Sequence, residues 1–230
     1  MNIMNPNNAA AAPSVEASGA MLVDLTTGQV LFSKEEDAML PPASITKLMT
    51  AFLVREAIEA GELSWNQEVT PSAEALALTQ KPGLARIPLV NKPYTVKELY
   101  DVALIRSANE AAVTLGEAVS GSEAAFVELM NERATALGMT QTTFANASGL
   151  DSVSAGRPGE NLTSASDLMK LALAYLSKYP DVLDVTKQAY VDIDGVRFEA
   201  TNRMLAGRDL SYTGMLGFKT GTTDDAGYCF

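Results

Sequence analysis

The sequence contains no histidine. This excludes enzymes in which a serine or cysteine nucleophile depends on a histidine base, such as the Ser-His-Asp and Cys-His types. A zinc site is also not expected, because histidine is one of the principal ligands of zinc in proteins. If a serine acts as a nucleophile in this chain, its base must be another side chain, and lysine is the natural candidate.

Cysteine and long apolar runs are scarce as well. The single cysteine, Cys229, cannot form an internal disulfide. No apolar run reaches the roughly 18 residues that a transmembrane helix needs. Residues 1–14 are rich in Asn and Ala and lack the basic start and leucine-rich core of a signal peptide, so we expect a disordered tail or a tag there.

Positive charge is the third deficit. The chain has 17 Lys and Arg against 28 Asp and Glu, which gives a formal net charge of −11. Nucleic acids and anionic membranes both require a basic surface and are disfavoured as partners. With 230 residues, 47% of them hydrophobic, the chain is expected to fold as one large domain or two interleaved lobes.

A predicted helix over residues 43–61 carries the first candidate site. Two prolines precede it, and apolar residues then recur at helical spacing until Gly61. Ser44 and Lys47 lie three residues apart and share one face of the first turn, so a hydroxyl adjoins an amine. The helix N-terminus and burial both favour an uncharged amine, which can accept the serine proton. Alone, a Ser-x-x-Lys pattern is more often a helix cap followed by a solvated lysine.

Two further motifs follow in a fixed order. Ser107–Asn109 falls at the junction of two predicted helices, 95–106 and 111–119. Lys219–Gly221 lies in a predicted strand over residues 214–223, whose glycines indicate close approach by a ligand. Each motif alone has an ordinary explanation as a turn, a helix cap or a solvated strand charge. The three together, each in its expected setting, are a specific combination.

Strand patterns occur towards both ends of the chain. Predicted hairpins at 19–34 and 190–198, together with the strand that carries Lys219, flank a long helical region. We therefore predict an α+β fold in which both chain ends build one antiparallel sheet and an all-helical lobe is inserted between them. The sheet lobe would comprise residues 15–43 and 190–230, and the helical lobe residues 44–189.

The three motifs resemble those of the penicillin-recognising serine enzymes, which share the β-lactamase-like fold. Within this group the chain is most similar to the low-molecular-mass penicillin-binding proteins, the serine-type D-alanyl-D-alanine carboxypeptidases. The likeness covers roughly residues 15–230 and extends to the segments Pro42–Thr50, Ala136–Met139, Lys219–Thr223 and Ala226–Tyr228. It implies a hydrolase of peptidoglycan biosynthesis, which acts on the cell wall and influences cell shape.

The resemblance implies a role for each residue of the first two motifs. Ser44 would attack the carbonyl between the two terminal D-alanines of a peptidoglycan stem peptide and form an acyl-enzyme. Lys47 would accept the proton of Ser44. Ser107 would relay a proton toward the leaving amine, and Asn109 would hold Lys47 or the substrate amide.

The third motif would bind the substrate. Lys219 would supply positive potential near the substrate carboxylate, and Thr220 and Thr222 would donate hydrogen bonds to it. Gly221 would let the peptide lie along the strand as an added edge. The backbone N–H groups of Ser44 and Thr222 would form the oxyanion hole.

Partners and location also follow from the resemblance. The substrate would be a stem peptide ending in D-Ala-D-Ala, and β-lactams would acylate Ser44 as mimics of it. No metal and no other cofactor is implied. Such enzymes work outside the cytoplasm, either secreted or on the outer face of the bacterial cell membrane, although this sequence shows neither signal peptide nor membrane anchor.

The sequence departs from the family pattern in two places. Ala108 stands where carboxypeptidases of this kind often have glycine, a change of one methyl group. The family's sheet continues with further strands and a terminal helix, whereas this sequence ends at Phe230. We expect those C-terminal elements to be missing, and the polypeptide alone to be unstable or inactive. Basic residues near Asn202 and Arg203 are further candidates for assisting carboxylate binding.

Two alternatives share the architecture. A β-lactamase of class A would need a Glu-x-x-Leu-Asn segment that positions the deacylating water. The nearest match, Glu160–Leu162, has the wrong spacing. A non-catalytic relative that only binds the cell wall would keep the fold without turnover, and the intact motifs argue against it.

Overall fold

The computed structural model describes residues 14–81, 87–152 and 159–230. The predicted tail, residues 1–14, lies outside these ranges except for Ser14. Within them the chain is a mixture of helices and short strands, which confirms the predicted α+β class.

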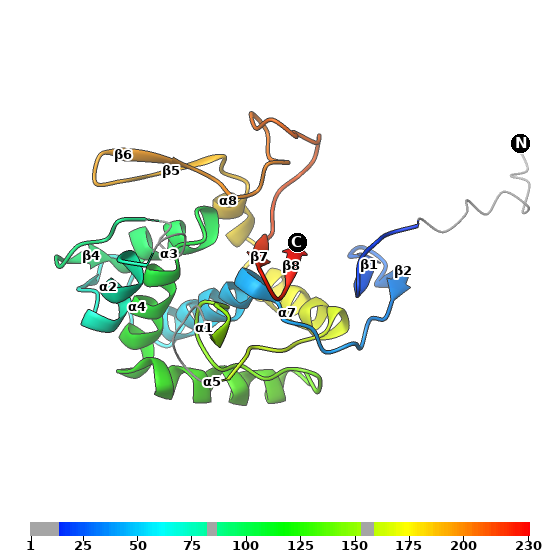
Figure 1. The fold of residues 1–230 in the computed structure, drawn as a ribbon, viewed down its shortest axis with the longest axis horizontal. Coiled ribbons are helices and arrows are strands. Elements are labelled where there is room, and N and C mark those ends of the chain that lie inside the picture. The colour runs from blue at the N-terminus through cyan, green and yellow to red at the C-terminus, as the bar shows by residue number, and fades with distance from the viewer. Residues whose placement is uncertain (1–13, 82–86, 153–158) are drawn as a thin grey trace, which may run out of the picture.

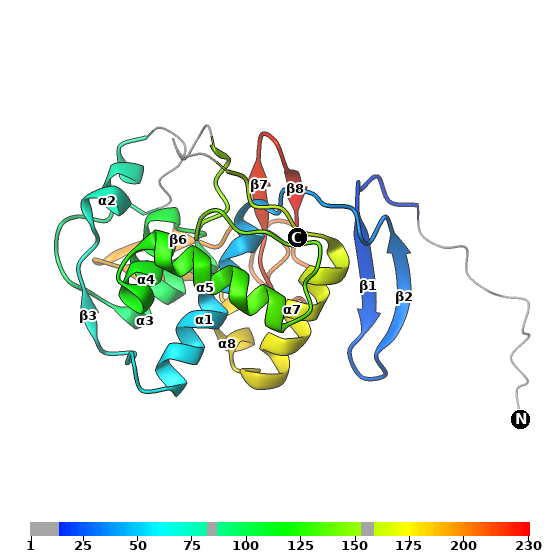
Figure 2. The ribbon, with the colours of Figure 1, turned by 90° about the horizontal axis from the view of Figure 1, so that it is seen from below.

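Helix α1 is the centre of the helical part. A 3-10 helix, η1 (Ala43–Thr46), runs directly into α1 (Lys47–Glu59), which is buried around most of its circumference. Four longer helices contact α1: α3 (Val96–Ile105), α4 (Asn109–Ser120), α5 (Glu123–Ala136) and α7 (Ala165–Lys178). Figures 1 and 2 both show α1 in the middle of this group. A helix that is apolar on nearly all sides is stable only inside such a core.

Side-chain caps determine where these helices begin. Thr95 and Glu98 form a capping box at the start of α3. Ser122 and Ser164 each accept a backbone N–H bond in the first turn of α5 and α7. Gly138, at φ 69°, follows the C-terminus of α5, as a left-handed glycine commonly does. The sequence signals for these boundaries are confirmed.

Two short helices complete the helical part. They are α2 (Ala73–Thr79), capped by Ser72, and α8 (Val182–Thr186), which begins just after Pro180. The sequence pattern does not predict α8, because five residues are too few to show a helical period.

The described strands form four separate antiparallel pairs. The pairs are β1 (Ala20–Asp24) with β2 (Gln29–Lys34), β3 (Glu68–Val69) with β4 (Tyr94–Thr95), β5 (Tyr190–Ile193) with β6 (Val196–Glu199), and β7 (Gly221–Thr223) with β8 (Gly227–Cys229). Asp194 and Gly195 both have positive φ in the predicted turn between β5 and β6, as a two-residue hairpin requires.

The predicted joining of both chain ends into one sheet is not seen. Among the described strands, β1 and β2 pair only with each other, and so do β7 and β8. The reason is that the two hairpins rest on different elements, β1 beside α7 and β7 against η1. Hydrogen-bonded strands must be about 4.8 Å apart. Figures 1 and 2 show β1–β2 clearly apart from β7–β8.

The predicted strand over residues 214–223 is wrong for most of its length. Only Gly221–Thr223 is strand, as β7. Gly214 and Gly217 adopt φ values of 91° and 137°, which lie outside the strand region and interrupt any ladder. Lys219 therefore lies in an irregular segment just before β7.

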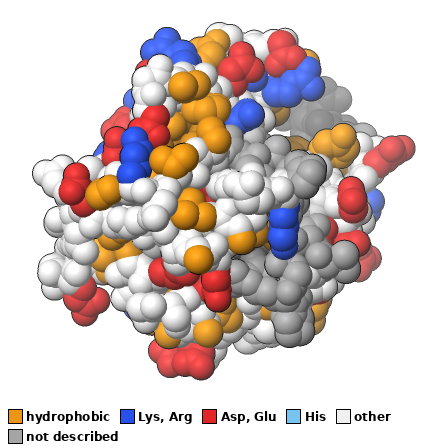
Figure 3. Space-filling model, turned by 60° about the vertical axis from the view of Figure 1, so that its left-hand side comes forward, with side chains coloured by type: hydrophobic (Ala, Val, Ile, Leu, Met, Phe, Trp, Pro, Cys, Tyr) orange, Lys and Arg blue, Asp and Glu red, His pale blue; other side chains and the backbone are white. Residues whose placement is uncertain are grey.

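The surface has acidic and basic side chains interspersed. Figure 3 shows Asp and Glu side chains distributed over one face, with Lys and Arg side chains among them. Of the helices in the described part of the chain, none combines the length and apolar character needed to cross a membrane.

Candidate active site

The hydroxyl of Ser44 and the amine of Lys47 are in contact at the start of the central helix. Ser44 lies in η1, Lys47 is the first residue of α1, and the distance from Nζ to Oγ is 2.8 Å. The Lys47 side chain has no exposed surface. Ala43, directly before Ser44, is held at φ 46°, a conformation that non-glycine residues rarely adopt and that concentrates at functional sites. The predicted contact is thus formed, between a fully buried amine and a partly buried hydroxyl.

Two carbonyl oxygens also accept hydrogen bonds from the Lys47 amine. They are Asn109 Oδ1 at 2.7 Å and the backbone oxygen of Ser148 at 2.6 Å. An uncharged amine has two N–H groups and one lone pair. If the two carbonyl oxygens take the two N–H groups, the lone pair is left for the hydroxyl of Ser44. The geometry therefore suits a base that removes the serine proton.

The second and third motifs meet through another lysine and serine. Lys219 Nζ lies 2.9 Å from Ser107 Oγ, and the two residues are only 3% and 4% exposed. Ser107 has φ 66°, a rare conformation at the turn between α3 and α4. Phe218 packs edge-on against the buried ring of Tyr175, at 5.4 Å between ring centroids, and so fixes the residue next to Lys219.

The strand after Lys219 lies directly against the turn that carries Ser44. A Cβ atom at Gly221 would be 3.0 Å from both Pro42 O and Ser44 N, so any residue larger than glycine would fit at this position only with difficulty. The first N–H groups of a helix have no partner within the helix. The N–H of Ser44, in the first turn of η1, lies beside Gly221 at the start of β7.

The hydroxyl groups of Thr220 and Thr222, which are predicted to bind the substrate carboxylate, have different hydrogen-bond partners. Thr220 Oγ1 is 2.7 Å from Thr201 Oγ1, a partner that the sequence does not indicate. Thr222 is exposed and donates to the backbone oxygen of Gly221. The two hydroxyl groups are thus held by neighbouring protein atoms rather than by each other.

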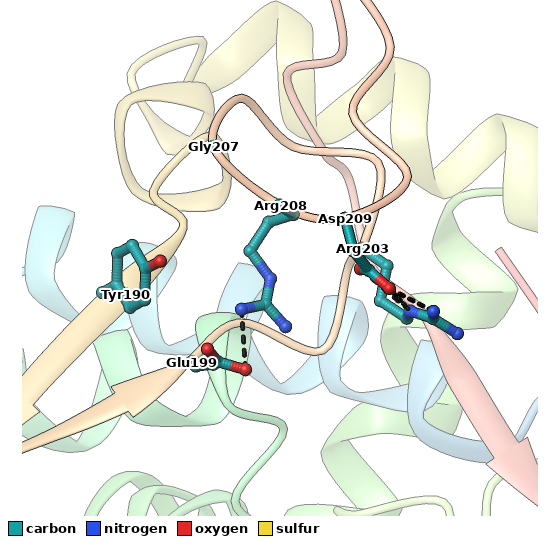
Figure 4. Close-up of a pocket in the computed structure, with 6 residues that line it drawn as sticks. All are labelled: Tyr190, Glu199, Arg203, Gly207, Arg208 and Asp209. Atoms are coloured by element: carbon teal, nitrogen blue, oxygen red, sulfur yellow. Dashed lines mark hydrogen bonds and ion pairs between the residues drawn. The ribbon is translucent and has the colours of Figure 1, made fainter.

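A separate hollow of about 610 Å³ contains Arg203. Its lining is Tyr190, Glu199, Arg203, Gly207, Arg208 and Asp209. Figure 4 shows Arg203 beside Asp209 and Arg208 reaching Glu199. The Arg203 hydrogen bonds hold the pKa of Asp209 below its ordinary value. The charges in this hollow therefore pair with one another, and none of the motif residues lines it.

Three carboxylates gather near the far end of β7. Oxygen atoms of Asp151, Glu160 and Asp225 lie within 4.8 Å of one another. Burial raises the pKa of Asp151, and the charges of the other two raise it further. Exposed acidic groups of this kind are common without a bound ion.

The sequence of the chain matches one protein family over nearly its full length. The family is that of the D-alanyl-D-alanine carboxypeptidases, peptidase family S11, and the match covers residues 6–230. The chain belongs to this family.

Two curated relatives are similar to this family member along most of its sequence. DacC, a D-alanyl-D-alanine carboxypeptidase of Escherichia coli K12, is 35% identical over 221 residues, which cover 94% of this chain and 53% of that protein. DacF of Bacillus subtilis is 34% identical, with 93% of this chain and 53% of that protein covered. The chain thus spans about half the length of the curated relatives it matches.

Solved structures of penicillin-binding proteins have the same fold. A peptidoglycan synthesis regulatory factor (PBP3) of Streptococcus pneumoniae superposes with a TM-score of 0.90 at 37% identity, covering 94% of this chain and 62% of that chain. Penicillin-binding protein D2 of Listeria monocytogenes, in its cefotaxime-bound form, gives 0.82 at 36% identity, covering 95% and 85%. The predicted penicillin-binding-protein fold is confirmed.

Sequence reasoning missed one functional group of the site, the carbonyl of Ser148. A backbone oxygen carries no sequence signature of its own. The Asn, Ser and Gly residues of segment 144–150 indicate a turn but not what that turn contacts.

Proposed function

We propose that this chain is the catalytic part of a serine D-Ala-D-Ala carboxypeptidase. The single observation that carries the proposal is the buried Lys47 amine, within 2.8 Å of Ser44 Oγ and bonded to two carbonyl oxygens. An amine held in this way can accept a proton without a histidine.

The acylation step uses the first two motifs. Ser44 Oγ attacks the carbonyl carbon of the bond between the two terminal D-alanines while its proton moves to Lys47. The negative oxygen that develops is stabilised by the N–H groups of Ser44 and Thr222, a device worth about 3–4 kcal/mol per donor. The C–N bond then breaks, and Ser107 relays the proton held by Lys47 to the departing D-alanine amine, so that Lys47 is uncharged again. Water then attacks the ester carbonyl while Lys47 accepts its proton, and this proton passes to Ser44 Oγ as the ester C–O bond breaks.

Substrate binding uses the third motif. Lys219 places a positive charge beside Ser107, where it attracts the terminal carboxylate of the peptide. Thr220 and Thr222 supply hydroxyl groups for the same carboxylate, and Gly221 leaves the strand edge open for the peptide backbone. Asn109 holds Lys47 in position and stays within reach of the substrate amide.

The names of the relatives support the proposed substrate, a peptide ending in D-Ala-D-Ala, and the proposed inhibitors, the β-lactams. DacC and DacF are D-alanyl-D-alanine carboxypeptidases by name, and penicillin-binding protein D2 has been solved with cefotaxime and with ampicillin. We infer that β-lactams acylate Ser44 in this chain. Because peptidoglycan lies outside the cytoplasmic membrane, we infer that the enzyme works there. We also propose that its catalytic domain has a sheet lobe, residues 15–43 and 190–230, and a helical lobe, residues 44–189.

Release of D-alanine tests the proposal. The full-length protein, of which we propose that this chain is the catalytic part, is incubated with a synthetic stem peptide ending in D-Ala-D-Ala, and free D-alanine is measured. We expect the wild type to release D-alanine and Ser44→Ala to release none above background. The control is Ser64→Ala, which changes an exposed serine in a chance Ser-x-Asn pattern and should keep full activity. Equal release by wild type and Ser44→Ala would refute the proposal. A penicillin adduct lasting minutes fits the carboxypeptidase, and one lasting milliseconds fits a β-lactamase.

A further inference from the structure

The segment 145–150 is seated directly on the turn that carries the nucleophile. It places the Ser148 oxygen 2.6 Å from Lys47 Nζ. Gly149, at φ 81°, touches the same turn so closely that a Cβ there would be 1.8 Å from Ala43 O. The position of this segment therefore determines where one acceptor of the Lys47 amine lies.

The segment is neither helix nor strand, and hydrogen bonds from side chains hold its shape. Thr50 in α1 donates to the Ala147 oxygen at 2.7 Å, and Glu123 in α5 accepts the Ala147 N–H at 3.0 Å. Within the segment, Asn146 accepts from the N–H groups of Ser148 and Gly149. All of these groups are buried or nearly so. The segment is thus fixed by polar contacts rather than by a backbone ladder.

Asn161 connects the segment with Thr46, which directly precedes Lys47. Its Oδ1 accepts from the N–H groups of Ala145 at 2.6 Å and Asn146 at 3.0 Å. Its Nδ2 donates to Thr46 Oγ1 at 2.9 Å and to the Asn146 oxygen at 3.1 Å. These four bonds use both donors and both acceptor positions of the amide. The side chain is 4% exposed, so each bond replaces one that water would otherwise make.

We propose that Asn161 is a positioning residue for acylation. It fixes segment 145–150 relative to Thr46, so that the Ser148 oxygen takes one N–H of the Lys47 amine and the lone pair stays directed at Ser44. Without this bridge the carbonyl shifts and the amine rotates away from the hydroxyl. The inference rests on the proposed function, since it assigns Asn161 a part in the same proton transfer.

Asn131 provides a matched control, because it holds Phe144, the residue directly before the same segment. Its side chain accepts from Phe144 N at 2.8 Å and donates to Phe144 O at 2.9 Å, so it also anchors the loop through buried or half-buried amide bonds. A third bond goes to Val127 O within α5. None of these partners belongs to the turn of Ser44. Loss of Asn131 should therefore loosen the fold without moving the Lys47 amine.

The test compares Asn161→Ala with Asn131→Ala by stopped-flow reaction with a fluorescent penicillin. Saturation curves separate the limiting acylation rate from the dissociation constant of the first complex. We expect both variants to melt at lower temperature than the wild type. Only Asn161→Ala should lose limiting acylation rate, by roughly 10- to 100-fold, because misplacing a catalytic group by about 1 Å has an effect of this size. The dissociation constant should stay within about twofold of the wild type.

A second pair of variants keeps the test decisive if Asn161→Ala does not fold. Thr46→Val removes the hydroxyl that Asn161 bonds, whereas Thr46→Ser retains it. We expect the first to slow acylation and the second to acylate at close to the wild-type rate. Wild-type acylation by Thr46→Val, or equal slowing by Asn161→Ala and Asn131→Ala, would overturn the inference. Failure of the wild type to label Ser44 would instead overturn the proposed function.

Discussion

The Lys47 amine is buried against the hydroxyl of Ser44 and two carbonyl oxygens. It has no exposed surface and bonds Ser44, Asn109 and Ser148 within 2.8 Å. A protonated amine would donate a hydrogen bond in each of these contacts and would have no lone pair to accept the proton of Ser44. The proposed chemistry therefore requires the uncharged form, which burial favours.

Replacing Lys47 by methionine tests this role at similar side-chain volume. Lys47→Met should lower the rate of acylation by a penicillin about 10²- to 10⁴-fold, the usual contribution of a general base. Lys187→Met changes an exposed lysine that pairs with Asp184 and should leave the rate unchanged. Acylation of Lys47→Met at the wild-type rate would show that another group removes the serine proton.

The sequence predicted the motif side chains but not all of their partners. Ser44 with Lys47 could be paired from helical spacing, because three residues separate neighbours on one face. The contact of Lys219 with Ser107 joins residues far apart in the chain and could come only from family resemblance. Thr201, which meets Thr220, has no distinguishing pattern around it.

At the scale of elements, helices were predicted well and the last strand poorly. The starts of α3, α5 and α7 each carry a local capping signal that needs no tertiary information. The stretch 214–220 has small and apolar residues, as a strand can have. Its glycines adopt positive φ as readily as negative φ, and the sequence does not show which of the two they take.

Gly149 allows the segment 145–150 to approach the nucleophile turn. Gly149→Ala should lower the free energy of unfolding by more than the roughly 1–2 kcal/mol of left-handed strain, because its Cβ would meet Ala43 O at 1.8 Å. It should also slow acylation. Gly138→Ala, at φ 69° with open space around it, should show the strain alone and normal acylation. Equal effects of the two changes, measured by denaturant unfolding, would contradict the close approach.

An ion pair joins α1 to the residue that precedes α8. Both Asp181 oxygens accept from the Arg55 guanidinium, and this hydrogen bonding holds the pKa of Asp181 below its ordinary value. The pair therefore stabilises the fold above the ordinary pKa, and the stabilisation is lost as pH falls through the lowered pKa.

Unfolding measured at two pH values tests this pair. Because Asp181 is 57% exposed, Asp181→Asn should lower the free energy of unfolding at neutral pH by only about 0.2–1 kcal/mol. In strong acid the variant and the wild type should be equally stable. A deficit that persists in strong acid would mean that the change acts through packing instead. Asp192→Asn, in a more exposed pair with Arg197, should change stability less.

At the scale of the whole molecule, the proposed nucleophile and base lie at the start of a buried helix, and short hairpins lie around the helical part. The sequence predicted the hairpins at β1–β2 and β5–β6 from their turns. It did not predict that, among the described strands, each hairpin would pair with no third strand. Pairing between distant strands depends on where the helices place them, and local patterns contain no such information. The site nevertheless forms, because its groups come from η1, α1, the α3–α4 turn and the residues before β7.

The most direct test of the central claim is the mass and position of a penicillin adduct. The full-length protein is treated with benzylpenicillin, its intact mass is measured, and peptides are mapped by tandem mass spectrometry. We predict one penicilloyl group per chain, attached to Ser44, and none on Ser44→Ala. An adduct on any other residue, or an unmodified Ser44 in folded protein, would contradict the assignment of Ser44 and Lys47 as nucleophile and base.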